Sequence, residues 1–351
     1  MISKANKVLG ALGVAATLFA GAASMAQAET TVTYAGWGGS TSESVLKGLF
    51  ADAEKLGFTV RDELSGGWAG IKAHLTSGAP GWDIADIGFA RCEEASQAGL
   101  LMPVDYSIID KSKIPAAFAQ ANYIGTYTFS YGLAYQKSKY GEAPQTWADF
   151  WDVAKFPGRR AMNSQGLYAL EAALMADGVK PEEVYATLKA PGGVDRAFKK
   201  LEEIKPSVGV WWRSPADVMQ LMRDGEVDMA VFPNGRAMSL AKEGADVGFV
   251  WNQAFLDITG WLLPKNAGDP AAAMKLIDSA LDPVNQANFA VLSGYGPANP
   301  KAFDTGIISP ELMAWMPTAP QNLALQVLVD PTWYASAEAT AAYERFGKFI
   351  Q

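Results

Sequence analysis

Residues 31–48 read TVTYAGWGGSTSESVLKG and combine a β-rich run, a glycine turn and the start of a helix. The run before Trp37 is rich in β-branched and aromatic residues, which favour strands. Ser40 and Glu43 have the S-x-x-E spacing of a capping box, so we expect a helix to begin there. Trp37 therefore lies in a tight turn between strand and helix, where burying a large ring is difficult.

The same alternation of strand and helix continues along the chain. Strand-like runs rich in β-formers are followed by segments with helical spacing of apolar residues. Examples are FTVRDEL, WAGIKAHLTSG, DIADIGFA and the repeated strand and helix patterns of residues 208–244. This order predicts parallel sheets covered by helices on both faces. A ligand crevice is expected beyond the carboxyl ends of the strands, where Trp37 and residues 89–91 would lie.

The first 28 residues have the pattern of an export signal. Lys4 and Lys7 precede an apolar stretch, and residues 26–28 form an A-x-A cleavage site, so cleavage is expected after Ala28. No later segment offers the ~18 apolar residues of a membrane span. The remaining 323 of 351 residues suit two domains better than one. We therefore predict an exported, periplasmic protein.

Composition excludes several classes of function. Without the two lysines of the signal, 27 basic residues face 37 acidic ones, a net charge of −10 that disfavours nucleic acid and anionic membranes. Cys92 and His74 are the single residues of their types, too few for a His/Cys zinc site. A Ser-His-Asp triad would need His74 and lacks its G-x-S-x-G turn. We expect no enzyme, no metal and no cofactor.

Particular features of the sequence disfavour two further classes of protein. GWGGST after a strand imitates a dinucleotide-binding fingerprint, but Thr41 stands where the third glycine belongs. A structural or adhesive surface protein would show repeats or stalk-like segments, and the sequence has neither. Both alternatives are therefore disfavoured.

Six segments, taken in order, resemble those of a known family. They are YAGWGG, SGAPGWDIADIG, AGLLMPVDYS, TWADFWDVAKFPGR, MRDGEVDMAVFPNGRA and NQANFAVLSGYGPANP. Together the chain resembles the polyamine-type (spermidine/putrescine) substrate-binding proteins of ABC importers. The resemblance implies a type II periplasmic binding protein fold of the α/β class. Each of its two lobes would hold a mixed, mainly parallel sheet flanked by helices, with the ligand in the interlobe cleft.

The resemblance also implies a division of the chain and a set of partners. Lobe one would comprise residues 29–134 and 260–305, and lobe two residues 135–259 and 306–351. The protein would act as a monomer that captures a small molecule by lobe closure. It would then deliver this ligand to a permease in the inner membrane.

Several positions match cleft residues of the family. Trp37 would form a flat wall beside a glycine loop that approaches the ligand closely, although it could instead cap the core of its lobe. Residues 257–259 align with a Trp-x-Asp motif of the family. Asp257 stands in place of the tryptophan and Thr259 in place of the aspartate, so one acid is offset and the aromatic ring is lost. Phe232 precedes Asn234 as an aromatic precedes Asn-Gly in the family, and Tyr295 matches its Gly-Tyr.

One departure from the family changes the expected ligand. Residues 163–168 read NSQGLY and offer no carboxylate before Glu171, where polyamine binders hold ammonium groups. A methylated onium group has no N–H to satisfy and can be held by aromatic faces. The sequence therefore predicts a zwitterionic onium osmolyte of the glycine betaine or dimethylsulfoniopropionate type. Its candidate walls are Trp37, Tyr168, Trp211 or Trp212, Phe232 and Tyr295.

Arginines near the predicted cleft suggest that the ligand also carries a carboxylate, which a guanidinium can clamp with two hydrogen bonds. Arg91 follows the third strand, and Arg213 follows two tryptophans; each could instead make a surface ion pair. For Arg236, expected on a helix, the surface ion pair is the preferred interpretation. Two other ligands stay open: a polyamine held by Asp257, and a small carboxylate or amino-acid derivative held by the arginines.

Overall fold

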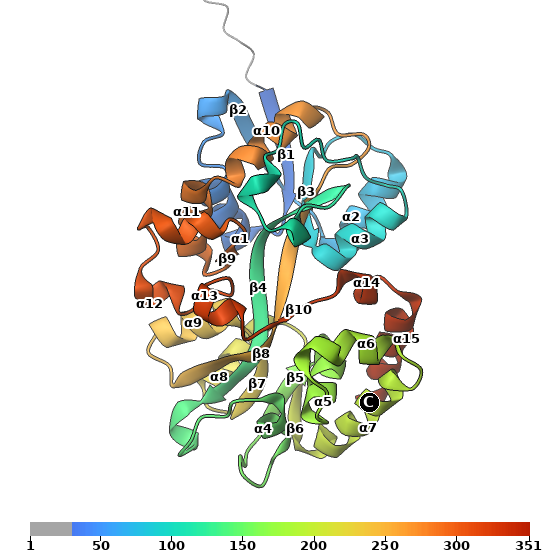
Figure 1. Cartoon of the computed structure of the whole chain (residues 1–351), viewed down its shortest axis with the longest axis vertical. Helices are drawn as coiled ribbons and strands as arrows, with labels where there is room; N and C mark the ends of the chain where they lie inside the picture. Colours follow the sequence, from blue (N-terminus) through green and yellow to red (C-terminus); the bar gives the residue numbers. More distant parts are fainter. Residues whose placement is uncertain (1–29) are drawn as a thin grey trace, which may run out of the picture.

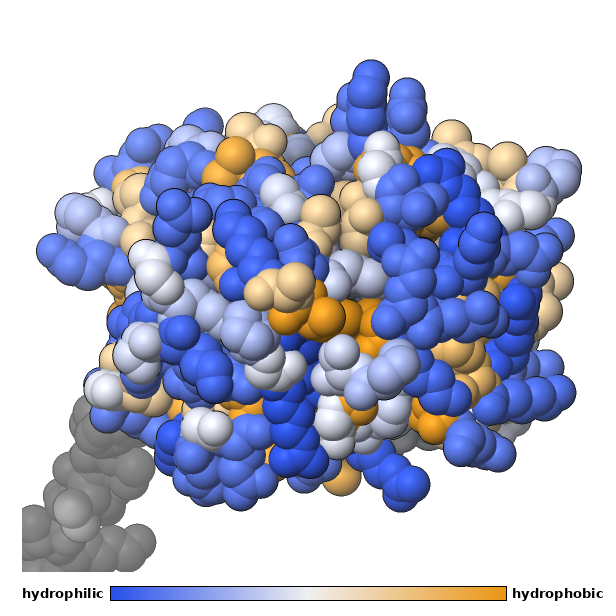
Figure 2. Space-filling view, turned by 90° about the horizontal axis from the view of Figure 1, so that it is seen from below, coloured by the Kyte–Doolittle hydropathy of each residue, from blue (hydrophilic) through white to orange (hydrophobic). Residues whose placement is uncertain are grey.

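The computed structural model describes residues 30–351, so the predicted signal peptide lies outside the described residues. Figure 1 shows two groups of helices and strands, one above the other, joined by two long strands that run through both. In residues 30–351, none of the helices combines the length and apolar composition needed to cross a membrane. Figure 2 shows a lower face that is mostly hydrophilic, with a hydrophobic patch near its centre and smaller ones toward its edges.

One ten-stranded sheet connects the two groups. Its two longest strands, β4 (Tyr123–Gln136) and β8 (Val247–Leu262), lie antiparallel at its centre. The strand order is β2-β1-β3-β8-β4-β7-β5-β6, with β9 beside β4 and β10 beside β8. The other strands are β1 (Thr30–Gly36), β2 (Phe58–Leu64), β3 (Ile84–Gly88), β5 (Arg160–Asn163), β6 (Val208–Trp212), β7 (Met229–Pro233), β9 (Gly296–Pro297) and β10 (Val327–Leu328).

Parallel pairing dominates outside the crossing strands. β1 pairs in parallel with β2 and β3, and β5 pairs in parallel with β6 and β7. The crossing strands add the antiparallel pairs of β8 with β3 and of β4 with β7. The predicted mixed, mainly parallel sheets are therefore confirmed.

Helices cover the sheet in both groups, as Figure 1 shows. The upper group holds α1 (Gly39–Ser44), α2 (Gly67–Ser77), α3 (Phe89–Gln97), α10 (Pro270–Ala280) and α11 (Pro283–Ser293). The lower group holds α4 (Trp147–Trp151), α5 (Ala169–Ala176), α6 (Val184–Lys189), α7 (Gly193–Ile204), α8 (Pro215–Arg223), α9 (Asn234–Lys242) and α15 (Ala337–Phe349). Three short helices link the groups near the C-terminus: α12 (Pro310–Met313), α13 (Pro320–Leu323) and α14 (Pro331–Tyr334).

The first turn differs from its predicted form. α1 begins at Gly39, and its N-cap is Gly38, which makes no side-chain cap. The expected capping box of Ser40 and Glu43 is therefore wrong. Gly38 has a φ of 73°, a left-handed conformation that strongly favours glycine, so the glycines after Trp37 set the geometry of the turn.

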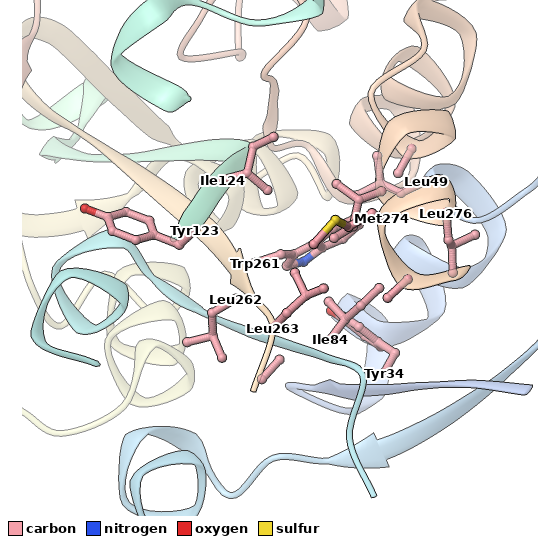
Figure 3. Close-up of a cluster of buried hydrophobic side chains, with 14 of the residues drawn as sticks. Tyr34, Leu49, Ile84, Tyr123, Ile124, Trp261, Leu262, Leu263, Met274 and Leu276 are labelled. Atoms are coloured by element: carbon pink, nitrogen blue, oxygen red, sulfur yellow. The ribbon is translucent and has the colours of Figure 1, made fainter. Parts of the chain in front are cut away.

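Separate apolar cores lie in the two groups. In the upper one, Trp261 of β8 packs against Tyr34 and Phe50, with ring centroids 5.9 and 5.0 Å away, and Figure 3 shows it beside Met274. The lower cores lie under α5, α7 and α15 and under α8 and α9. A small fourth cluster joins Ile308 and Met316 to α11. The lobe boundaries inferred from the sequence stay a prediction. Residues 306–319, which that prediction places in lobe two, contact the upper group.

Gly48, in a π-helical turn at Val45–Leu49, fixes the distance to α11. A Cβ there would lie 2.5 Å from the Cα atom of Phe289 and 2.7 Å from its amide nitrogen, both backbone atoms. We therefore expect Gly48→Ala to lower the free energy of unfolding by about 1–3 kcal/mol, measured by urea denaturation.

The matched control for this substitution is Gly347→Ala in α15. A Cβ at Gly347 would have no atom within 4 Å, so this change should stabilise the protein by about 0.5–1 kcal/mol. Equal effects of the two substitutions would contradict the close packing of α11 on Gly48.

Candidate ligand site at the crossing strands

Aromatic side chains gather on one face of the crossing strands. Tyr127, Phe129 and Tyr131 lie two residues apart on β4, and alternate residues of a strand point to the same face. Asp257 of β8 lies directly across from Phe129. Tyr295, just after α11, stacks on Tyr127 with ring centroids 5.7 Å apart and an interplanar angle of 8°. The result is an aromatic surface with a carboxylate beside it.

Asp257 is the partly exposed carboxylate of this surface. Its Oδ2 atom accepts a hydrogen bond of 2.7 Å from the Tyr168 hydroxyl, and Oδ1 accepts one of 2.7 Å from the Ile258 amide. Burial raises the pKa of Asp257 to about 6, against the opposing effect of these two hydrogen bonds. The group is therefore ionised at neutral pH and can accept further hydrogen bonds.

Tyr168 is held in an uncommon conformation to reach Asp257. It is buried at the N-cap of α5 with a φ of 60°, which costs energy for a residue other than glycine. Its ring stacks on Phe255 with centroids 5.1 Å apart and an interplanar angle of 11°. Packing thus fixes the hydroxyl that orients the Asp257 carboxylate.

A second carboxylate, Asp86 in the middle of β3, is fully buried. It accepts hydrogen bonds from the hydroxyls of Tyr34 at 2.5 Å and Tyr127 at 3.0 Å, and from the Trp37 indole at 3.2 Å. Burial raises its pKa to about 6. These donors occupy its oxygens, so Asp86 positions the three side chains rather than presenting a free charge.

The contact with Asp86 explains why Trp37 occupies a tight turn. The side chain is 44% exposed, while its N–H is anchored to the carboxylate. The ring is therefore presented at the surface instead of capping the core. Its proposed contact with ligand stays a prediction. Sequence reasoning missed Asp86, although an acid inside the otherwise apolar strand IADIG was a usable signal.

Arg236, in the first turn of α9, carries an unpaired charge. The side chain is exposed and has no hydrogen bond or ion pair with any of residues 30–351, so the predicted surface ion pair is wrong. Its charge lies close enough to lower the pKa values of Tyr131 and Tyr295, which burial raises. The guanidinium therefore borders the aromatic surface.

The other two predicted arginines differ from each other. Arg91 makes an ion pair of 2.7 Å with Glu94 and lies over the Trp68 ring at 5.8 Å, so its charge is already paired on the surface. Arg213 is exposed just beyond β6 and has no hydrogen bond or ion pair within the described chain. Its role in binding stays a prediction.

Three of the aromatic side chains predicted to line the ligand are instead covered by other parts of the protein. Phe232 is fully buried in the core beneath α8 and α9, and Trp212 is 2% exposed in the same core. Trp211 packs against Phe346 and Phe349 of α15, with ring centroids 5.7 and 6.4 Å away. Phe232 and Trp211 therefore do not line the aromatic surface, because their strands turn these rings toward helices.

Asn234 and Thr259 are both buried. Asn234 joins three segments: Oδ1 accepts from the Ser130 amide at 2.9 Å, and Nδ2 donates to the carbonyls of Gly294 at 3.3 Å and Trp315 at 3.0 Å. Its polar atoms are used within the protein, so it clamps β4 to the segments after α11 and α12 rather than facing a ligand.

Residues 30–351 contain no group of three or more His, Cys, Asp or Glu side chains placed to hold a metal ion. A surface pocket is lined by Lys55, Lys275 and Asp282, among others, and shares no residue with the aromatic surface. The surface around Tyr131 and Asp257 therefore remains the candidate site.

Comparison with known proteins assigns the family. Residues 50–320 match the model for bacterial extracellular solute-binding proteins. The chain belongs to this family. A γ-aminobutyric acid-binding protein of Pseudomonas aeruginosa is 33% identical to it over 317 residues, which cover 89% of each chain.

Two solved structures resemble this solute-binding protein over 92% of its chain and 100% of theirs. An ABC transporter substrate-binding protein from Bradyrhizobium japonicum USDA 110 is 41% identical, with a TM-score of 0.85. The periplasmic binding protein MotA from A. tumefaciens B6, solved in complex with glucopine, is 35% identical, with a TM-score of 0.81. The two-lobed periplasmic binding protein fold predicted from the sequence is thereby confirmed. The assignment to the polyamine-type family was too narrow and is corrected to the broader family.

Proposed function

We propose that this solute-binding protein is the extracytoplasmic component of an ABC importer and binds a small amino acid whose ammonium and carboxylate groups are separated, as in γ-aminobutyric acid. One observation carries the proposal. Asp257 lies directly across from Phe129 on the crossing strands, and Arg236 lies in the first turn of α9, which begins directly after Pro233, the sheet partner of Tyr131. Charges of both signs therefore border one aromatic surface.

The chemistry of such a ligand matches these two groups. An ammonium group needs acceptors for its N–H bonds, and Asp257 offers an ionised carboxylate with exposed surface. A carboxylate suits a guanidinium, which can donate two parallel hydrogen bonds. The methylene chain would lie against Phe129 and Tyr295. Charge-assisted bonds of about 1.5–3 kcal/mol each would supply much of the ~8 kcal/mol that micromolar binding needs.

This proposal replaces the onium osmolyte and the polyamine predicted from the sequence, which the comparisons do not support. The related proteins are described with γ-aminobutyric acid and with glucopine. A methylated onium group would leave Asp257 without an N–H donor, and a polyamine has no anion for Arg236. The proposal agrees with the third ligand considered from the sequence, an amino-acid derivative held by arginines.

Delivery to a membrane permease follows from the role in an importer. The two groups of elements are joined by β4 and β8, and the candidate site lies on these strands. A ligand bound there would contact both groups, and closure around it would present the loaded form to the permease. The relative from Bradyrhizobium japonicum is described as an ABC transporter substrate-binding protein, which supports this part of the proposal.

A thermal-shift screen of residues 29–351 tests the proposal. The panel contains γ-aminobutyric acid, glucopine, glycine betaine, dimethylsulfoniopropionate, putrescine, spermidine and butyrate. A ligand that binds the native state alone, at 100 times its Kd, stabilises it by about 2.7 kcal/mol. We expect γ-aminobutyric acid to raise the melting temperature and the onium compounds and polyamines to leave it unchanged. A shift with spermidine or glycine betaine alone would refute the proposal.

A further inference from the structure

Trp212, the last residue of β6, carries a polar group that the protein leaves unused. The side chain is 2% exposed, and its indole nitrogen is buried without a hydrogen-bond partner within residues 30–351. Native proteins pair nearly all such groups, so a buried orphan donor calls for an explanation. The sequence analysis proposed this ring, or that of Trp211, only as an aromatic wall.

The indole lies beside the candidate ligand site. Its ring is nearly parallel to that of Tyr131, with an interplanar angle of 8° and centroids 6.4 Å apart. Tyr131 also contacts the ring of Tyr168, whose hydroxyl donates to Asp257. Trp212 is thus joined by ring contacts to the residues that border the ligand.

Two further donors of the candidate site also lack acceptors. The Tyr131 hydroxyl has no hydrogen-bond partner among the described residues, and neither has the Arg236 guanidinium. Tyr131 pairs with Pro233 in the sheet, and Arg236 lies in the first turn of α9, which begins at the next residue. Donors therefore gather around Tyr131, and the acceptor Asp257, which accepts from Tyr168, lies across from Phe129.

We propose that the Trp212 indole N–H, the Tyr131 hydroxyl and Arg236 together form a subsite for the carboxylate of the ligand. The inference rests on the proposed function and specifies how the ligand is oriented. A carboxylate has two oxygens and about four acceptor positions, which suits several donors at once. The ligand carboxylate then points toward α9 and β6, and its ammonium points toward Asp257.

The test replaces Trp212 by phenylalanine, which keeps an aromatic ring and removes only the N–H donor and part of the ring. Affinity for γ-aminobutyric acid is measured by calorimetry. We expect Trp212→Phe to weaken binding roughly 10- to 100-fold, as for a lost hydrogen bond to a charged group. Tyr131→Phe removes a single hydroxyl and should also weaken binding. This second variant keeps the inference testable if the tryptophan variant fails to fold.

Trp333→Phe is the matched control. Trp333 of α14 is also buried with an unpartnered indole nitrogen, but it lies in the core formed with α15. Its replacement should leave the Kd within about twofold of the wild-type value, the scatter expected away from the site. Weakening of equal size in both tryptophan variants would overturn the inference.

NMR gives a direct readout of the same donor. The indole N–H resonance of Trp212 is assigned as the one that is missing from the spectrum of Trp212→Phe. In the wild type this resonance should move when γ-aminobutyric acid is added. It should move much less with n-butylamine, which lacks the carboxylate. Tight binding with an unmoved resonance and a wild-type Kd for Trp212→Phe would overturn the inference while leaving the proposed function intact. Failure of the wild type to bind any amino acid would refute the proposed function and the inference together.

Discussion

Asp257→Asn is expected to weaken the binding of γ-aminobutyric acid by roughly 100-fold, which corresponds to about 2.7 kcal/mol. The substitution keeps the shape of the side chain and an oxygen for the Tyr168 hydroxyl, but removes the negative charge that faces the ammonium. The Kd is measured by isothermal titration calorimetry at pH 7.5. Asp304→Asn serves as the control, because Asp304 is exposed and this substitution removes the same charge from a residue outside the candidate site.

The binding of ligand should also depend on pH through Asp257. Burial raises its pKa to about 6, and only the ionised form attracts an ammonium group. Affinity should therefore be constant above pH 7 and should fall as the pH drops through 6, by about tenfold per unit well below it. The Asp257→Asn variant should lose this dependence. A wild-type affinity that stays flat down to pH 5 would show that Asp257 does not hold the ammonium.

Glu171→Gln is expected to stabilise the protein at alkaline pH. Glu171 of α5 is fully buried, its Oε1 atom accepts from the Tyr334 hydroxyl at 2.7 Å, and Oε2 has no hydrogen-bond partner among residues 30–351. No cation is paired with it in the described chain. Burial raises its pKa from 4.5 to about 7, because the charged form loses water without gaining a counterion.

The direction of the effect follows from proton uptake. Between pH 4.5 and 7 the folded protein holds a proton on Glu171 that the unfolded chain has released, so stability falls as the pH rises through this window. Above pH 7 the buried charge costs on the order of 3 kcal/mol. Glutamine has no charge to bury and can donate to Tyr185, which also approaches Glu171.

Urea denaturation at pH 5 and at pH 8 measures this effect. Glu171→Gln should resemble the wild type at pH 5 and exceed its free energy of unfolding by up to about 3 kcal/mol at pH 8. Asp86 and Asp257 titrate in both proteins, so the difference between the two isolates Glu171. Glu344→Gln, an exposed glutamate of α15, should show no such difference. A variant that is less stable than the wild type at pH 8 would contradict the account.

The fold could be predicted from local patterns because strands and helices alternate with clear turn signals. The run at residues 31–48 forms β1 and α1, with the glycines after Trp37 making the turn between them. The start of α1 was missed because Gly38 itself adopts the left-handed conformation. Local sequence carried less information about the C-terminal segment, where residues 306–319 pack on α11 through contacts distant in sequence.

The site was harder to predict than the fold, because exposure depends on which face of each strand a helix covers. Phe232 and Trp211 have aromatic side chains at strand ends, yet helices bury one and α15 covers the other. The period-two run Tyr127, Phe129 and Tyr131 was a readable signal of one aromatic face. The absence of a partner for Arg236 could not be read from sequence, since ion pairing depends on tertiary neighbours.

Calorimetric titration of residues 29–351 with γ-aminobutyric acid, n-butylamine and butyrate tests the central claim most directly. The three ligands share a four-carbon chain and differ only in which charged groups they carry. The account predicts measurable, specific binding of γ-aminobutyric acid, with each singly charged compound at least about 100-fold weaker, as expected when a charged partner is left unpaired. Equal affinity for γ-aminobutyric acid and either analogue, or binding of none of the three, would contradict it.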